Sequence, residues 1–145
     1  MFMGEYSHSI DAKGRLIMPA KLREQLGNTF VITRGLDGCL FVYTDEEWKI
    51  KEEKFREIPL TKKEARTFAR FFFAGAAQLE IDKQGRVLIP STLREHASLD
   101  KEVVLVGVLD RVEIWDKKRW EDTNTYSEDE MDEIAEKMAE LGIGI

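Results

Sequence analysis

Residues 10–19 read Ile-Asp-Ala-Lys-Gly-Arg-Leu-Ile-Met-Pro, and residues 81–90 repeat the pattern as Ile-Asp-Lys-Gln-Gly-Arg-Val-Leu-Ile-Pro. The two copies are 71 residues apart, and Leu-Arg-Glu at 22–24 recurs at the same offset at 93–95. Because similarity at a fixed spacing means that one supersecondary unit occurs twice, the fold should be built from two similar halves.

Each copy is predicted to be a small β-α-β unit. The Asp-x-x-Gly-Arg motif predicts a turn, because glycine tolerates positive φ and aspartate bonds back to nearby amides. Short buried strands should follow at 15–18 and 86–89, and brief helices should begin at the prolines, over 19–26 and 90–97. Residues rich in β-formers then predict a hairpin at the end of each copy.

Three further helices are predicted by capping-box spacing, in which Thr or Ser is followed three residues later by Glu. They should begin at Thr44, Thr61 and Ser127. The first should end at Pro59, and the second, which is rich in phenylalanine, at Gly75. The third has acids in its first turn, where they favour the helix dipole, and an apolar stripe further along.

These elements predict an α+β fold with two tandem β-α-β repeats. We assign the repeats to residues 5–47 and 76–119, the connecting helices to 48–75 and an acidic C-terminal helix to 120–145. Each repeat is too small to bury its own sheet, so both should fold together as one pseudo-twofold barrel with flanking helices.

Composition narrows the class of protein. The chain has 145 residues, 43% of them hydrophobic, and no apolar run long enough to cross a membrane, so we expect one compact cytosolic body. A single cysteine, Cys39, and two histidines at different places in the repeats are too few ligands for a zinc site. We therefore expect no metal and no cofactor.

Charge is separated along the chain. The net charge of −6 at first argues against a nucleic-acid partner. However, residues 121–145 hold nine acids and one base, which leaves residues 1–120 at +2. Residues 49–76 carry eight bases and four acids. This asymmetry permits a basic face beside an acidic tail.

The doubled motif strongly resembles the MraZ family, and the resemblance covers nearly the whole chain. It rests on Gly4-Glu-Tyr6, Asp11-Ala-Lys-Gly-Arg15, Pro19, Phe73-Ala-Gly-Ala76, Asp82-Lys-Gln-Gly-Arg86, Ile89-Pro90 and Leu105-Val-Gly107 through Trp115. It implies an AbrB-like barrel and a cytoplasmic, nucleoid-associated transcription regulator. Such a regulator would be a ring-shaped homo-oligomer that binds double-stranded DNA at short direct repeats upstream of the division and cell-wall gene cluster.

The resemblance also indicates candidate DNA-binding residues. The family's Asp-x-x-x-Arg signature corresponds to Asp11 with Arg15 and to Asp82 with Arg86. Independently of the family, an arginine on a turn that also carries a lysine offers a planar fork for phosphates or guanine edges. The wider AbrB-like class uses a further basic residue on the short helix. The predicted DNA-binding residues are therefore Lys13, Arg15, Lys83, Arg86, Arg23 and Arg94, and the turn residues are Asp11, Gly14, Asp82 and Gly85.

Glu24 and Glu95, next to the helix arginines, depart from the more basic helices of the AbrB-like class. The resemblance to the AbrB-like class therefore holds at the turns more fully than on the short helices that carry Arg23 and Arg94.

Other interpretations remain open. The motif could be a purely structural turn in which each aspartate pairs with its own arginine. An enzyme is disfavoured, because Asp11 and Asp82, the symmetric acids of the two turns, each lie beside a guanidinium that would oppose a shared proton. An oligomeric interaction scaffold that does not read DNA is the main alternative, and the net charge of −6 supports it. A homo-oligomer is expected in either case, because the apolar helix faces exceed what one small barrel covers.

Overall fold

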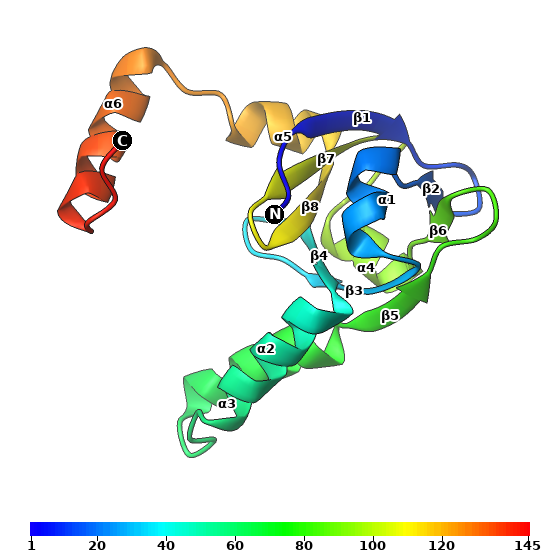
Figure 1. The fold of residues 1–145 in the computed structure, drawn as a ribbon, viewed down its shortest axis with the longest axis horizontal. Helices are drawn as coiled ribbons and strands as arrows, with labels where there is room; N and C mark the ends of the chain where they lie inside the picture. The colour runs from blue at the N-terminus through cyan, green and yellow to red at the C-terminus, as the bar shows by residue number, and fades with distance from the viewer.

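The computed structural model describes residues 1–145 and confirms the α+β fold. Figure 1 shows one curved sheet around two short helices, a helical hairpin that extends from it, and a C-terminal helix that stands apart. In chain order the elements are β1 (Glu5–Ser9), β2 (Arg15–Ile17), α1 (Ala20–Leu26), β3 (Thr29–Arg34), β4 (Leu40–Thr44), α2 (Asp45–Arg56), α3 (Lys63–Ala69), the π-helical turn η1 (Arg70–Ala74), β5 (Ala77–Glu80), β6 (Arg86–Leu88), α4 (Ser91–His96), β7 (Glu102–Val108), β8 (Arg111–Asp116), α5 (Lys117–Thr123) and α6 (Glu128–Glu140).

The two repeats are interleaved in a six-stranded antiparallel sheet. Its strand order is β1-β7-β8-β4-β3-β5, so each repeat's first strand pairs with the hairpin of the other repeat. β4 and β8 pair at the centre, and the order reads alike from both ends, which gives the expected pseudo-twofold arrangement. The sheet is open, with β1 and β5 at its edges.

The remaining strands, β2 and β6, form a separate two-stranded antiparallel ribbon. Arg15 lies opposite Leu88, Leu16 opposite Val87, and Ile17 opposite Arg86. Backbone bonds tie each strand's end to the other repeat's turn, because the N–H of Met18 donates to Gly85 O and the N–H of Ile89 donates to Gly14 O, both at 2.9 Å. The ribbon therefore holds the two Asp-x-x-Gly-Arg turns at its opposite ends.

The hydrophobic core lies inside the curve of the sheet, and both repeats supply it from matching positions. Leu16, Met18 and Leu22 from the first copy are buried, as are their counterparts Val87, Ile89 and Leu93. Full burial of side chains of this size contributes roughly 1.5–3 kcal/mol each, so the core fixes the ribbon and the short helices in place.

A second apolar cluster covers the outer face of the sheet. Tyr43 and Phe72 are buried there, and Trp48 stacks on Phe72 with ring centroids 5.2 Å apart. Trp120 meets Trp115 at 5.5 Å on the second repeat. The aromatic residues around η1 thus pack α2 and α3 together and onto β4.

Two helix predictions need correction. The Thr61 capping box is absent, because α3 begins after Lys62 with no side-chain cap, and Arg66 Nη1 instead donates to the carbonyls of Leu60 and Thr61 at 3.0 and 3.1 Å. Helix α5 was not predicted, although Asp116 caps it by accepting from the N–H of Arg119. The caps at Thr44 and Ser127 are confirmed.

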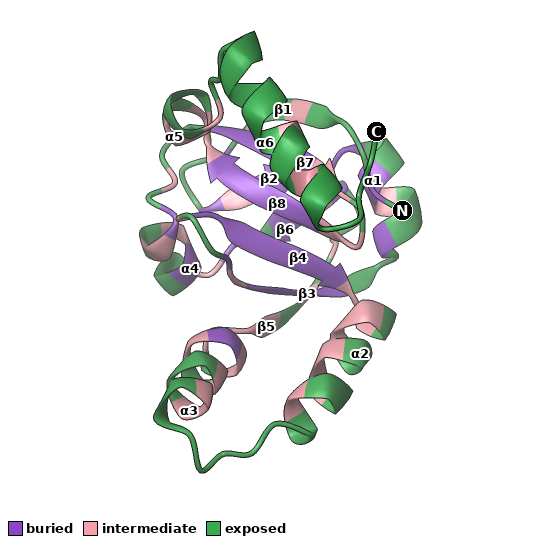
Figure 2. Ribbon diagram, turned by 90° about the vertical axis from the view of Figure 1, so that its left-hand side faces the viewer, coloured by how far each residue is buried: buried purple, intermediate pink, exposed green.

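Figure 2 shows that burial is concentrated in the sheet, whereas the helices at the periphery are largely exposed. None of the helices has the length and apolar character needed to cross a membrane.

Candidate nucleic-acid interface

The two turns have the same internal hydrogen bonds. Asp11 Oδ1 accepts from the backbone N–H groups of Lys13 and Arg15, both at 2.9 Å. Asp82 Oδ1 accepts in the same way from Gln84 at 2.9 Å and Arg86 at 2.8 Å. The backbone is thereby held in the tight conformation that brings each arginine back over its own aspartate.

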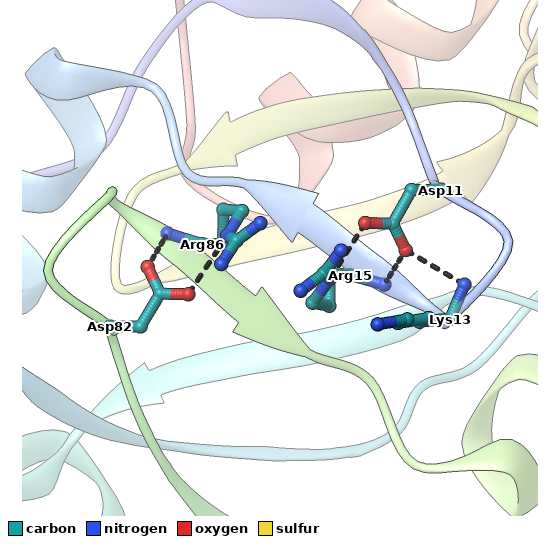
Figure 3. Close-up of polar contacts among 5 residues, drawn as sticks. All are labelled: Asp11, Lys13, Arg15, Asp82 and Arg86. Carbon is teal, nitrogen blue, oxygen red and sulfur yellow. Dashed lines mark hydrogen bonds and ion pairs between the residues drawn. The ribbon is translucent and has the colours of Figure 1, made fainter.

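The second oxygen of each aspartate orients the arginine side chain. Asp11 Oδ2 accepts from Arg15 Nε at 2.7 Å, and Asp82 Oδ2 accepts from Arg86 Nε at 2.9 Å (Figure 3). No Nη atom of either arginine donates a hydrogen bond within the chain. Since Nε is occupied and the Nη groups have no partner in the chain, each guanidinium is held in a fixed direction with its terminal fork available to a ligand.

Both aspartates are held ionised. The backbone N–H of Arg15 is the main cause that lowers the pKa of Asp11, and the Arg15 side chain adds to it. The backbone N–H of Arg86 lowers the pKa of Asp82 in the same way. Two carboxylates that each bond to their own turn do not form a proton-sharing dyad, so this geometry gives no support to an acid–base enzyme.

Glycine is required at the bend of each turn. Gly14 has a φ of 87° and Gly85 a φ of 78°, a region that other residues rarely adopt. Each glycine is also covered by an arginine from the other repeat. A Cβ on Gly14 would lie 2.7 Å from Cζ of Arg94, and a Cβ on Gly85 would collide with Nη1 of Arg23.

Arg23 and Arg94 therefore lie beneath the turns. Each half-buried side chain passes under the opposite turn, and Arg94 Nε donates to Ile89 O at 3.0 Å. Lys13 and Lys83, in contrast, are exposed on the turns. The structure thus brings all six predicted basic residues to the two ends of the ribbon, with the helix pair packed under the turn glycines.

The outward face of the ribbon contains residues that sequence reasoning missed. The segments at 15–18 and 86–89 were expected to be buried, yet Ile17 is 50% exposed and Leu88 56% exposed. They lie on the same face as Arg15 and Arg86, whereas Leu16 and Val87 point into the core. The strict alternation of a strand is the signal that could have separated the two faces.

No group of three or more His, Cys, Asp or Glu side chains is placed to hold a metal ion. Cys39 is buried, and burial raises the pKa of its thiol far above the usual range, so it is not a reactive nucleophile.

The sequence that forms the two turns and the ribbon matches a known protein family. The family model described as "MraZ protein, putative antitoxin-like" matches this chain twice, over residues 1–71 and 72–141. The chain belongs to the MraZ family.

Curated MraZ relatives align along their full length. The chain is 59% identical over 143 residues to the transcriptional regulator MraZ of Ligilactobacillus salivarius, 59% identical over 146 residues to that of Acetivibrio thermocellus, and 57% identical over 143 residues to that of Heliobacterium modesticaldum. In each case 99% of this chain aligns with 100% of the relative. The resemblance inferred from the doubled motif is thereby confirmed.

Proposed function

We propose that this MraZ protein is a sequence-specific DNA-binding transcriptional regulator that uses the β2/β6 ribbon as its reading element. The observation that carries the proposal is the pair of arginine forks, each held through Nε by its own aspartate while both Nη groups stay free. A two-stranded ribbon fits the major groove of B-DNA, and a bidentate arginine is the commonest reader of guanine O6 and N7. The curated relatives are named transcriptional regulators, which agrees with this role.

The supporting residues have distinct roles in this proposal. Arg15 and Arg86 read base edges, and the exposed Lys13 and Lys83 contact phosphates. Asp11 and Asp82 orient the arginines, while Arg23 and Arg94 support the turns from below and reach DNA only at the rim of the interface. The operator is proposed to be a set of short direct repeats upstream of the division and cell-wall gene cluster, as the family resemblance implies.

A mobility-shift titration tests DNA reading. DNA-free protein is titrated with a duplex from the region upstream of its own gene and with a scrambled duplex of equal length. We expect a strong preference for the upstream duplex, and the double variant Arg15→Ala/Arg86→Ala should lose that preference. Arg56→Ala, which removes an exposed arginine at the end of α2, serves as the matched control. An unchanged preference in a folded double variant would refute the proposal.

We also propose that the protein works as a homo-oligomer, in the form of a ring. Helix α6 is the first support, because large apolar residues on it and just after it are exposed: Met131 is 43% exposed, Ile134 37%, and Leu141, which follows the helix, 71%. An isolated helix of 13 residues is marginal in water, so α6 needs a surface to pack on.

The second support is a groove on α3 that suits α6 of another copy. It is lined by Leu36, Phe68 and Phe71, with Lys63, Glu64 and Thr67 at its side. Residues 62–70 carry four bases and one acid, whereas α6 carries seven acids and one base. Packing of α6 from one copy into the groove of the next is a head-to-tail contact, and such contacts form a ring when the rotation between neighbouring copies closes on itself.

Mixing two variants tests this contact. Ile134→Glu disables α6 and leaves the groove intact, while Phe68→Glu disables the groove and leaves α6 intact. Each variant alone should be smaller than the wild type in light scattering, and an equal mixture should form one-to-one pairs. A wild type that stays at 16.8 kDa across micromolar concentrations would exclude the ring.

The alternative function is an oligomeric scaffold for protein partners. The net charge of −6 and the uncovered apolar surfaces favour it. In that case the oligomer would form normally and the upstream duplex would bind no better than the scrambled one. For the DNA-binding function we propose a cytoplasmic, nucleoid-associated location.

A further inference from the structure

The outward face of the β2/β6 ribbon carries two aliphatic side chains as well as two arginines. Arg15 and Leu88 form one cross-strand pair on this face, and Ile17 and Arg86 form the other. Both aliphatic residues expose half or more of their surface. Each cross-strand pair thus combines one free guanidinium fork with one uncovered hydrocarbon group, in a pattern that the pseudo-twofold axis repeats.

Packing of the hydrophobic core does not explain why positions 17 and 88 are aliphatic. Leu16 and Val87, which alternate with them, already fill the buried side of the ribbon. Ile17 and Leu88 therefore lie outside the core, between two groups that are positioned to meet DNA. Two apolar groups placed between the arginine forks would complement a ligand that has an apolar feature beside its polar edges.

In the major groove that feature is the 5-methyl group of thymine, which apolar side chains contact. We propose that Ile17 and Leu88 read thymine methyl groups next to the bases read by Arg86 and Arg15. This inference rests on the proposed DNA-binding function, and it assigns to the ribbon a preference for sites that combine guanine with thymine.

The spacing of the ribbon fits such a site. Residues two apart on a strand are separated by about 6.6–6.8 Å, so this distance separates the two cross-strand pairs. Base pairs rise by about 3.4 Å each, which places the two pairs about two base pairs apart along the groove. The thymines read by Ile17 and Leu88 should accordingly lie about two base pairs from each other.

Replacing thymine by uracil tests the proposal, because it removes the methyl group and changes no charge or base pairing. Each thymine of the upstream duplex is replaced in turn, and wild-type affinity is measured. Binding should weaken about fourfold at each thymine that is read, the value expected for one buried methyl-sized group. The dependence on salt should not change, since no phosphate contact is lost.

Protein variants then assign each methyl to its reader. The measured quantity is the ratio of the affinities for the thymine and the uracil duplex at each position. Ile17→Ala should bring this ratio to one at one set of positions, and Leu88→Ala at the other set. Leu109→Ala, which shortens an exposed leucine away from the ribbon, should keep both ratios. Light scattering on the same samples should show an unchanged oligomer.

Three outcomes would overturn the proposal. First, the wild-type affinity could stay the same after every replacement of thymine by uracil. Second, the thymine-to-uracil affinity ratios could persist in Ile17→Ala and Leu88→Ala. Third, these variants could change the size of the oligomer, which would make Ile17 and Leu88 part of a subunit contact. The first two results leave DNA binding itself intact if Arg15→Ala/Arg86→Ala still abolishes the preference for the upstream duplex. A failure of the methyl reading is thus distinguishable from a failure of the DNA-binding function.

Discussion

The first and second turns share one backbone geometry and differ in where they carry charge. The distance between arginine Nε and aspartate Oδ2 is 2.7 Å in the first turn and 2.9 Å in the second, and both bends use a buried glycine at positive φ. Lys13 takes the third position of the first turn, where the second has Gln84, and Lys83 takes the second position, where the first has Ala12. Aspartate, glycine and arginine therefore set the shape, while the position of the lysine varies without altering it.

The largest difference between the turns is expected from removing their arginines one at a time. Arg15→Ala should weaken DNA binding by on the order of 1–3 kcal/mol per site and reduce the preference for the upstream duplex over the scrambled one. Arg86→Ala should cost less binding free energy. Lys13 lies beside Arg15 (Figure 3), so we expect the first turn to make the closer contact with DNA. In a ring the losses multiply over adjacent operator repeats, so binding to multi-repeat DNA should collapse first. Titrations with one-repeat and multi-repeat duplexes measure this, and equal losses in both variants would make the turns equivalent readers.

The next effect concerns stability, where the turns should behave alike. Gly14→Ala and Gly85→Ala each force a side chain into the left-handed region and against an arginine of the other repeat, at a cost of about 1–3 kcal/mol. Gly27→Ala is the control, because its φ is 80° and nothing lies within 4 Å of the added carbon. Denaturant unfolding of the three variants separates backbone strain from the collision. If only one turn variant is destabilised, the geometric equivalence of the turns is wrong.

The lysines should give a smaller effect that is independent of sequence. Lys13→Ala and Lys83→Ala each remove one proposed phosphate contact, so the slope of log K against log salt should fall by about 0.9 in each variant. All duplexes, scrambled ones included, should weaken alike. A change in base preference in either variant would move that lysine from phosphate contact to base reading.

The smallest effect is acid sensitivity. Because hydrogen bonds from backbone N–H groups lower the pKa of both Asp11 and Asp82 in the folded state, their contribution to stability is present above about pH 4 and is lost as pH falls through the lowered pKa. Asp11→Asn and Asp82→Asn keep an oxygen that can accept the turn bonds. Their melting temperatures should therefore fall less than that of the wild type between about pH 5 and pH 2, and an identical decline would show that other acids control it.

The sequence predicted the parts of the fold that depend on local pattern. The turns and the proline-initiated helices follow from residue type, and they occur where expected within one or two residues; each copy also ends in the expected hairpin. Helix α5 was missed, although Asp116 follows the cap residue Thr44 by 72 residues and Trp120 follows Trp48 by 72, one residue more than the offset of the two turns. The Thr61 box failed because its spacing is necessary for a cap but does not fix where the helix begins. The division into segments 5–47, 48–75, 76–119 and 120–145 stays a prediction.

The arrangement of the site was beyond local pattern. No strand was predicted over β1 or β5, and local pattern does not show which strands pair, so the exchange of these two strands between the repeats was not predicted. For the same reason Arg23 was placed on a helix surface, whereas it packs under Gly85 of the other repeat. The residues of the turns were identified from the motif, while the free Nη forks and the exposed Ile17 and Leu88 required the tertiary structure.

The exchange of strands has a consequence for synthesis of the chain. Glu5 pairs with Val106, about a hundred residues later, so β1 has no partner until most of the protein has been made. Because the ribosome adds about 5–20 residues per second, β1 stays unpaired on both edges for on the order of 5–20 s during synthesis. An unpaired strand edge invites aggregation, so chaperones that shield nascent chains should matter for the yield of this protein. A message truncated before β7 produces a chain that lacks β7 and β8 and cannot complete the sheet.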